Sequence, residues 1–359
     1  MALRSRLLAS VLAPLALAAC EHAAPGSVHA PTDVGPFTTT LPRRLTFSVL
    51  NDRTPSVTGS VLVYARQGEA YPNSGYGPTG REECLAFLPV EGGTIERLVC
   101  PHSLLSPADT FVNTWHEPAL SPDGTRIAFT WERGLNVGML GYWEKYLMVT
   151  PVDRPTDTTQ IRAMVNYVEA GLFSRRADFA SKIAWLDEGH LRFLATWEHI
   201  FTVRGSGSER VTDTTYVPLA LEDMDLATQA ITPVPGGDSV IAWAPAPSGG
   251  IWVVREPQPD SLFLLDSVMH LRTPVGRFNS GVTDLAAVDG AAVAITGGGT
   301  ALERLDPATG AVTVLPSSFA GPMVHIAAAG GRRFVVEAQQ ATQPFGAPTD
   351  LWLLEVPGP

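Results

Sequence analysis

The residues best suited to chemistry in this sequence are His116 and Glu117, in the stretch WHEPALSPDGTRIAFTW. A glutamate can accept a hydrogen bond from a ligand amine or help to hold a cation, and a histidine can act as a base. Both residues precede a short apolar strand, so we expect them near one mouth of a central channel if the chain forms a ring of repeats. The alternative is that Glu117 pairs with a neighbouring repeat and that His116 is a hydrogen-bonded rim residue.

A second charged group, Arg175, Arg176 and Asp178, stands at the corresponding approach to the next repeat. Guanidinium groups bind carboxylates through paired hydrogen bonds, so an arginine pair at a channel mouth would clamp an acidic ligand. The alternative is a solvated surface or a partner for Glu117. These three residues, with His116 and Glu117, are the candidate binding residues at the channel mouth.

Known catalytic motifs are missing from the sequence. There is no Gly-x-Ser-x-Gly elbow, no histidine pair at zinc-protease spacing, and no EF-hand, Walker or dinucleotide loop. We therefore assign no catalytic residue, no metal ligand and no cofactor. The alternative is an enzyme of the lactonase or lyase type that uses a cation or acid–base groups at the channel. It would need side chains from several repeats, and the later repeats offer only Asp238, Asp284 and His325.

The elements that would position these residues are short strands joined by tight turns. Ser121-Pro122-Asp123-Gly124 predicts a hairpin, because proline presets φ at the second position of a type I turn, aspartate bonds to the backbone and glycine adopts the left-handed conformation. After this turn, apolar residues alternate at Ile127, Phe129 and Trp131, which is the period of a β-strand.

Related turns recur along the chain at six glycines with spacings of 65, 65, 61, 40 and 40 residues: Gly59, Gly124, Gly189, Gly250, Gly290 and Gly330. A spacing of 40 is typical of a four-stranded propeller blade. The clearest blade has predicted strands at Val282–Val288, Ala291–Thr296, Ala301–Asp306 and Ala311–Leu315. We predict an all-β fold, a six-bladed β-propeller of four-stranded antiparallel blades. We expect the N-terminal strand RRLTFSVL to complete the last blade and close the ring.

The long repeats carry insertions, VNYVEAGLFSRRADFA between two blades and HIFTVRGSGSERVTDTTY inside one. Long loops on a rigid scaffold are frequent binding sites. Tyr142, Trp143 and Tyr146, placed just before a third strand, form either a protein-binding patch or, as we favour, packing.

The first residues predict export. Arg4 and Arg6 precede a short apolar run that ends in Leu-Ala-Ala-Cys20, so we assign residues 1–19 to a signal peptide, 20–42 to a flexible tether and 43–359 to the propeller. The end of the run resembles the bacterial lipobox, which implies that Cys20 carries the lipid anchor and that the protein lies in the cell envelope. Glu21 after the cysteine resembles the sorting pattern for the outer membrane. The alternative is an ordinary secretory signal in which Cys20 is incidental.

The two remaining cysteines, Cys84 and Cys100, lie symmetrically about Gly92. A hairpin that turns there brings them opposite each other, and an exported protein meets an oxidising compartment, so we predict a disulfide. The alternatives are two free buried thiols or a metal pair.

The composition sets limits on the partners. Apolar residues make up 45% of the 359-residue chain and charged residues 17%, with a net charge of −11. An acidic chain without a basic cluster argues against binding to nucleic acid. We expect a monomer, held on the membrane only through its lipid anchor.

The segment EPALSPDGTRIAFT resembles the TolB-type propeller repeat, whose hallmark is the Ser-Pro-Asp-Gly turn at residues 121–124. This resemblance implies a periplasmic binding module. We therefore expect a membrane-tethered propeller that presents a loop face to a protein or peptide in the envelope, on the periplasmic side of the outer membrane or on the cell surface. A purely structural lipoprotein is a further alternative.

Overall fold

The computed structural model describes the structure of residues 40–47, 51–70, 81–93, 95, 97–99, 110–137, 140–153, 161–169, 180–195, 198–204, 211–217, 220–266, 268, 270–340 and 348–358. All regular elements within these ranges are β-strands. No helix in this part of the chain is long and apolar enough to cross a membrane.

Four separate sheets have four antiparallel strands each, in the order of a propeller blade. One sheet consists of β10 (Ala180–Asp187), β11 (His190–Ala195), β14 (Ala220–Asp225) and β15 (Ile231–Asp238). The next consists of β16 (Val240–Pro245), β17 (Ile251–Arg255), β18 (Gln258–Leu265) and β19 (Arg272–Arg277). A third consists of β20 (Val282–Val288), β21 (Ala291–Thr296), β22 (Ala301–Leu305) and β23 (Val312–Leu315). The last consists of β24 (Met323–Ala328), β25 (Arg333–Gln339), β26 (Thr349–Glu355) and the N-terminal β1 (Arg43–Arg44).

The first repeats are merged into one eight-stranded sheet. It holds β2 (Asp52–Thr58), β3 (Val61–Ala70), β4 (Arg81–Pro89), β5 (Arg97–Val99), β6 (Thr110–Leu120), β7 (Arg126–Val137), β8 (Leu140–Pro151) and β9 (Ile161–Glu169). The merger is a short parallel pairing of Arg81–Glu83 on β4 with Val112–Thr114 on β6, and every other pairing described in this sheet is antiparallel. The sheets therefore confirm a propeller with four-stranded antiparallel blades, and within the described residues they form four separate blades rather than the six expected.

Each predicted turn glycine lies between two antiparallel strands, as expected. In the Ser121–Gly124 turn, the Ser121 hydroxyl donates to Asp123 Oδ1 at 2.6 Å and accepts from the Arg126 N–H at 2.9 Å. Gly124 has a φ of 71°, which favours glycine. Local chemistry thus sets the hairpin geometry of this repeat.

The N-terminal strand closes the last blade, as predicted. Arg43 and Arg44 pair with Leu353 and Trp352 on β26, and the Leu45 N–H donates to the Leu351 carbonyl at 2.7 Å. The regular strand is shorter than the expected residues 43–50, of which residues 48–50 lie outside the described ranges.

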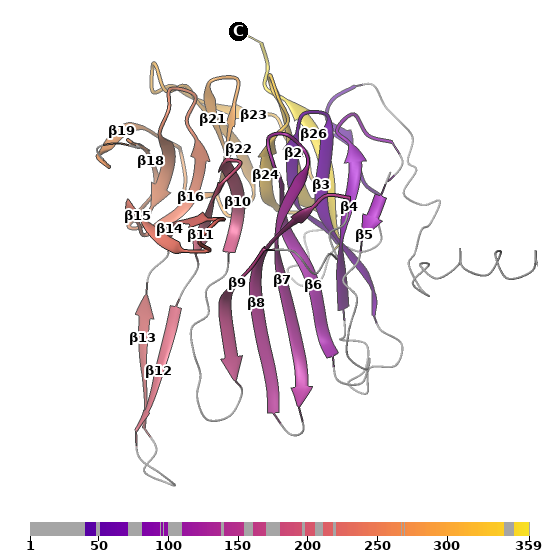
Figure 1. Cartoon of the computed structure of the whole chain (residues 1–359). Helices are drawn as coiled ribbons and strands as arrows, with labels where there is room; N and C mark the ends of the chain where they lie inside the picture. Colours follow the sequence, from indigo (N-terminus) through magenta and orange to yellow (C-terminus); the bar gives the residue numbers. More distant parts are fainter. Residues whose placement is uncertain are drawn as a thin grey trace, which may run out of the picture.

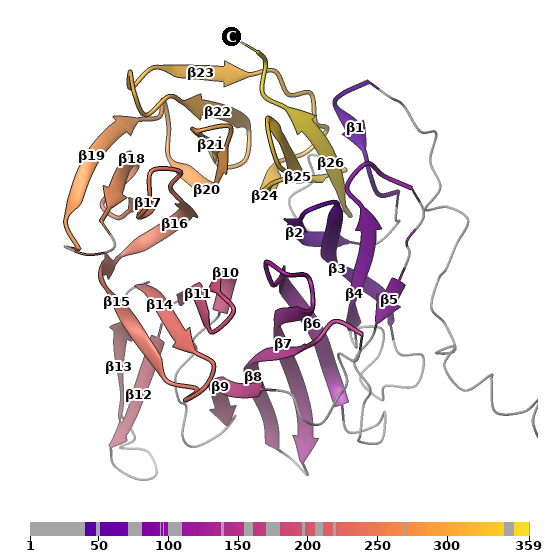
Figure 2. The ribbon, with the colours of Figure 1, turned by 45° about the horizontal axis from the view of Figure 1, so that its top comes forward.

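Figure 2 shows the sheets arranged around a centre, with β2, β6, β10, β16, β20 and β24 innermost. Apolar side chains fill the space between neighbouring sheets, and small residues such as Ala242, Ala244, Ala292 and Ala294 are buried where the innermost strands approach the next sheet. Burial of each large apolar side chain contributes about 1.5–3 kcal/mol, so these contacts hold the ring together.

The two ends of the innermost strands define two faces of the propeller. The turn face carries the turn glycines. The opposite loop face carries the long strands β6–β9 and the hairpin of β12 (Glu198–Arg204) with β13 (Val211–Val217), which project together toward the lower side of Figure 1. The predicted insertion HIFTVRGSGSERVTDTTY therefore contributes the β12–β13 hairpin between β11 and β14, and part of the other insertion belongs to β9.

The aromatic cluster lies within β8 rather than before a third strand, which corrects its predicted position. Tyr146 is buried and its ring contacts that of Trp131, with 5.5 Å between centroids. Tyr146 therefore packs, as we favoured, whereas the side chains of Tyr142 and Trp143 lie outside the described part of the structure.

Candidate functional site in the central channel

The innermost strands share a local irregularity that shapes the channel. Each one shifts its register against the second strand of its repeat, at Arg53/Ser56, His116/Ala119, Ser181/Ala184, Val240/Ala242, Val282/Asp284 and Met323/Ile326. A β-bulge bends a strand and redirects its side chains, and such bulges are common beside functional sites.

Three of these bulges hold a non-glycine residue at positive φ: Thr54 at 49°, Glu117 at 54° and Lys182 at 49°. Each has its N–H bonded to a neighbouring repeat. Thr54 N–H donates to Glu337 Oε2 at 2.9 Å, Glu117 N–H to Thr54 Oγ1 at 3.3 Å, and Lys182 N–H to Glu117 Oε2 at 2.8 Å. This backbone conformation costs of order 1–3 kcal/mol per residue, and the hydrogen bonds between repeats help to hold it.

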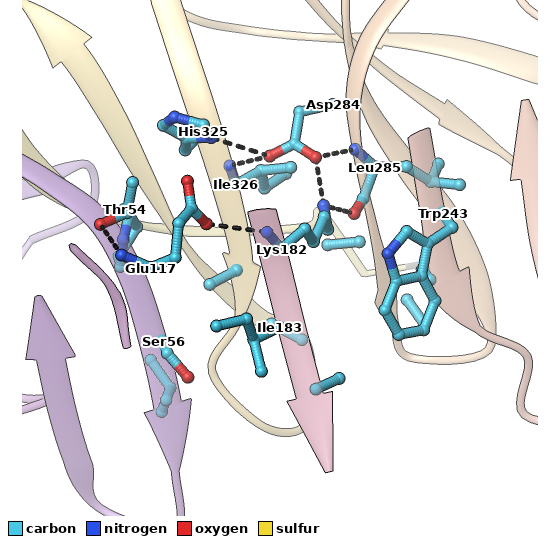
Figure 3. A pocket seen from close by; sticks show the side chains of 18 of the residues that line it. Thr54, Ser56, Glu117, Lys182, Ile183, Trp243, Asp284, Leu285, His325 and Ile326 are labelled. Atoms are coloured by element: carbon cyan, nitrogen blue, oxygen red, sulfur yellow. Dashed lines mark hydrogen bonds and ion pairs between the residues drawn. The ribbon is translucent and has the colours of Figure 1, made fainter. Parts of the chain in front are cut away.

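Asp284 joins three strands at the channel wall. Its Oδ1 accepts from the Leu285 N–H at 2.8 Å and from Lys182 Nζ, and its Oδ2 accepts from the Ile326 N–H at 2.8 Å (Figure 3). Lys182 Nζ also donates to the Leu285 carbonyl. Burial raises the pKa of Asp284, but the positive charges of Lys182 and His325 outweigh it and hold the pKa at about 2.

His325 lies between two carboxylates. Its Nδ1 is 3.7 Å from Asp284 Oδ2 and its Nε2 is 4.0 Å from Glu337 Oε2. Burial lowers the pKa of His325, but Glu337, Asp284 and Glu117 outweigh it and raise the pKa to about 9, so the ring is cationic at neutral pH. Burial raises the pKa of Glu337, although His325 opposes the shift.

A cavity of about 390 Å³ extends from these charged residues toward the turn face. All six innermost strands line it. Its walls are mainly apolar and include Ile183, Trp243, Pro245 and Ile326. We call it the turn-side cavity, and it combines apolar surface with a small number of charged groups, as small-molecule sites do.

A separate charged cluster lies toward the loop face. His116 Nδ1 is 3.4 Å from Glu83 Oε2, and His116 Nε2 is 3.7 Å from Glu132 Oε2. Arg53 pairs with the other oxygen of Glu83 at 3.3 Å. We call Arg53, Glu83, His116 and Glu132 the loop-side cluster.

The predicted site residues are thus divided between these two places. Glu117 lines the turn-side cavity and His116 belongs to the loop-side cluster. Asp284 and His325 reach the cavity, whereas Asp238 is exposed and pairs with arginines of the neighbouring sheet. The predicted residues that lie outside the described part of the chain are Arg175, Arg176 and Asp178.

Sequence reasoning missed Lys182 and Glu337, and it assigned the recurring Ile-Ala-Trp triplet that contains Trp243 to packing between blades. Lys182 follows Glu117 by 65 residues, as Gly189 follows Gly124, so an alignment of the repeats would have indicated its position at the channel. Glu337 lies on a second strand, β25, where no repeat signal marks it. Among the described residues, no group of three or more His, Cys, Asp or Glu side chains is arranged to hold a metal ion.

Comparisons with known proteins concern the fold. No protein-family model matches the chain, and no curated protein matches it either. Similar solved structures include the PQQ-bound aldose sugar dehydrogenase of Streptomyces coelicolor, with 14% identity, 90% of this chain and 99% of that chain covered, and a TM-score of 0.47. They also include TolB from Acinetobacter baumannii, with 14% identity, 82% of this chain and 63% of that chain covered, and a TM-score of 0.43. The structure of the RRP9 WD40 repeats has 10% identity, 88% of this chain and 97% of that chain covered, and a TM-score of 0.48.

Proposed function

We propose that the protein is a membrane-tethered propeller that binds a protein or peptide of the cell envelope at its loop face. The observation that carries this proposal is the projection of β6–β9 and of the β12–β13 hairpin from that one face (Figure 1). The loop-side cluster lies at the same end of the channel, so a partner held by the projecting strands would contact its charges.

The proposal includes a ring of six blades. In this interpretation the eight-stranded sheet is two blades, β2–β5 and β6–β9, because only three residue pairs join them in parallel. Six innermost strands line one cavity, which supports the interpretation.

The proposed cellular location of the protein is the cell envelope. Residues 1–19 would be removed, Cys20 would carry the lipid, and residues 20–42 would tether a monomeric propeller that begins at β1. We assign it to the periplasmic side of the outer membrane or to the cell surface.

A disulfide between Cys84 and Cys100 is part of the proposal. The β4–β5 register pairs Leu85 with Val99 and Ala86 with Leu98, and one further step would pair position 84 with position 100. Cys84 is buried on β4, and Cys100 lies outside the described residues.

The enzyme alternative uses a cation or acid–base groups at the channel, and Asp284 is one of the groups on which it would rely. Both oxygens of Asp284 accept hydrogen bonds from the protein, so this carboxylate is held as a structural acceptor. We therefore retain binding as the proposed function.

Cross-linking in intact cells tests the proposal. A photo-reactive amino acid replaces Thr214 on β13, and in the matched control it replaces Thr228, an exposed residue of the β14–β15 turn at the other face. We expect a discrete adduct with an envelope protein from position 214 and none from position 228. Equal labelling from both positions, or no adduct from several positions on β12 and β13, would contradict a partner at the loop face.

A further inference from the structure

The turn-side cavity contains a buried donor that has no partner within the described structure. Trp243 is 1% exposed, and its Nε1 has no hydrogen-bond acceptor among the described residues. The equivalent tryptophan of the preceding repeat, Trp185, donates from Nε1 to the Ala119 carbonyl at 2.9 Å. The fold thus satisfies one of these two indoles and leaves the other at the cavity wall, where an unpaired donor is unfavourable unless water or a ligand supplies an acceptor.

Two cations lie at the same cavity. An ammonium has three N–H donors, and Lys182 Nζ uses two of them on Asp284 and the Leu285 carbonyl. The His325 side chain is 35% exposed, and its ion-pair distances of 3.7 and 4.0 Å exceed those of a hydrogen bond. Both residues therefore retain the capacity to donate to a ligand.

Three of the carboxylate oxygens nearby already accept hydrogen bonds from the protein. Both oxygens of Asp284 accept from protein donors, and Glu117 Oε2 accepts from the Lys182 N–H. Glu117 lies on the opposite side of Lys182 from Trp243 (Figure 3). An acceptor group of a ligand is thus favoured on the Trp243 side, away from the Glu117 charge.

The other lining residues and the cavity volume limit what the rest of that ligand can be. Ile183, Pro245 and Leu285 line it with apolar surface, and a volume of about 390 Å³ is at the lower end for small-molecule sites. We propose that the turn-side cavity binds a carboxylate that carries an apolar group, with the carboxylate between Trp243 Nε1 and Lys182 Nζ. The carboxylate belongs either to a free acid or to the C-terminus of a peptide. This site lies apart from the loop face and does not depend on a partner there.

The test is NMR of the full chain labelled with ¹⁵N-tryptophan, titrated with octanoate and, as a charge control, with octylamine. Spectra of Trp243→Phe and Trp185→Phe assign the two indole signals. We expect octanoate to shift the Trp243 signal and leave that of Trp185 unchanged, and we expect Trp243→Phe to bind octanoate about tenfold more weakly. The Trp185→Phe variant should bind as the wild type does.

A second pair of probes separates the two sources of the carboxylate. These are a short peptide ending in leucine with a free C-terminus and the same peptide amidated. A Trp243 shift with octanoate supports a free acid, and a shift with the free peptide alone supports a peptide C-terminus. If neither carboxylate shifts Trp243, if octylamine binds as well as octanoate, or if Trp243→Phe binds with unchanged affinity, the proposal is wrong.

Discussion

Replacement of Asp284 by asparagine removes the carboxylate that joins β10, β20 and β24. The pKa of Asp284 is about 2 in the folded protein, against 3.8 for an unperturbed aspartate. Because the folded-state pKa is lowered, the ionised carboxylate stabilises the fold above pH 3.8, and this contribution is lost as the pH falls toward 2.

The linkage relation gives the size of the effect. With these two pKa values, the contribution of Asp284 to the free energy of unfolding is about 2 kcal/mol at about pH 5 and decreases by about 1 kcal/mol between about pH 5 and pH 3. Asparagine does not titrate, so the stability difference between the wild type and Asp284→Asn should narrow by that amount.

Urea unfolding of the full chain at about pH 5, 4 and 3 measures this difference. Asp289→Asn is the matched control, because Asp289 is an exposed carboxylate in the turn of the same blade, and its replacement should change stability by less than about 0.5 kcal/mol. If the wild type and Asp284→Asn keep a constant difference over this pH range, the assigned role of the Lys182–Asp284 pair is refuted.

Three further predictions concern the ends and the cysteines of the chain. Arg44→Ala removes the ion-pair partner that lies 2.6 Å from the buried Asp350 carboxylate, and it should destabilise the protein by about 1–3 kcal/mol at about pH 8. The loss should be smaller at about pH 5, because burial, opposed by Arg44, raises the pKa of Asp350 to about 6. Equal losses at both pH values would contradict this prediction. Reduction of the predicted Cys84–Cys100 disulfide should lower stability by about 3 kcal/mol in thermal or urea unfolding, with no effect of reductant on Cys100→Ser. Cys20→Ser should move the protein from the membrane pellet to the soluble fraction of fractionated cells, and unchanged pelleting would exclude a lipid anchor at Cys20.

Local features of the fold were predictable from the sequence. The strands of the β20–β23 blade were expected within one residue of their observed bounds, because each is delimited by turn residues such as Gly290 and Gly310. The pairing of β1 with β26 followed from counting strands, since the last repeat supplied only three.

The site was less predictable, because its contacts join residues far apart in the chain. Lys182 and Asp284 are 102 residues apart, and their meeting depends on where the bulges direct the side chains. The parallel contact between β4 and β6 depends on the length to which both strands extend, which turn chemistry does not set. The indoles of Trp243 and Trp185 occur in the same Ile-Ala-Trp triplet, so only the packing of neighbouring strands decides which of them finds an acceptor.

The pairing of β1 with β26 also has a kinetic consequence. The Thr46 hydroxyl accepts from the Leu351 N–H across 305 residues, so this contact closes a very long loop. Contacts of such separation form late, because the loop-closure entropy must be overcome before they contribute. Although β1 is synthesised before β26, it is therefore among the last strands to dock. The last blade cannot gain its fourth strand until β26 is available to pair with β1.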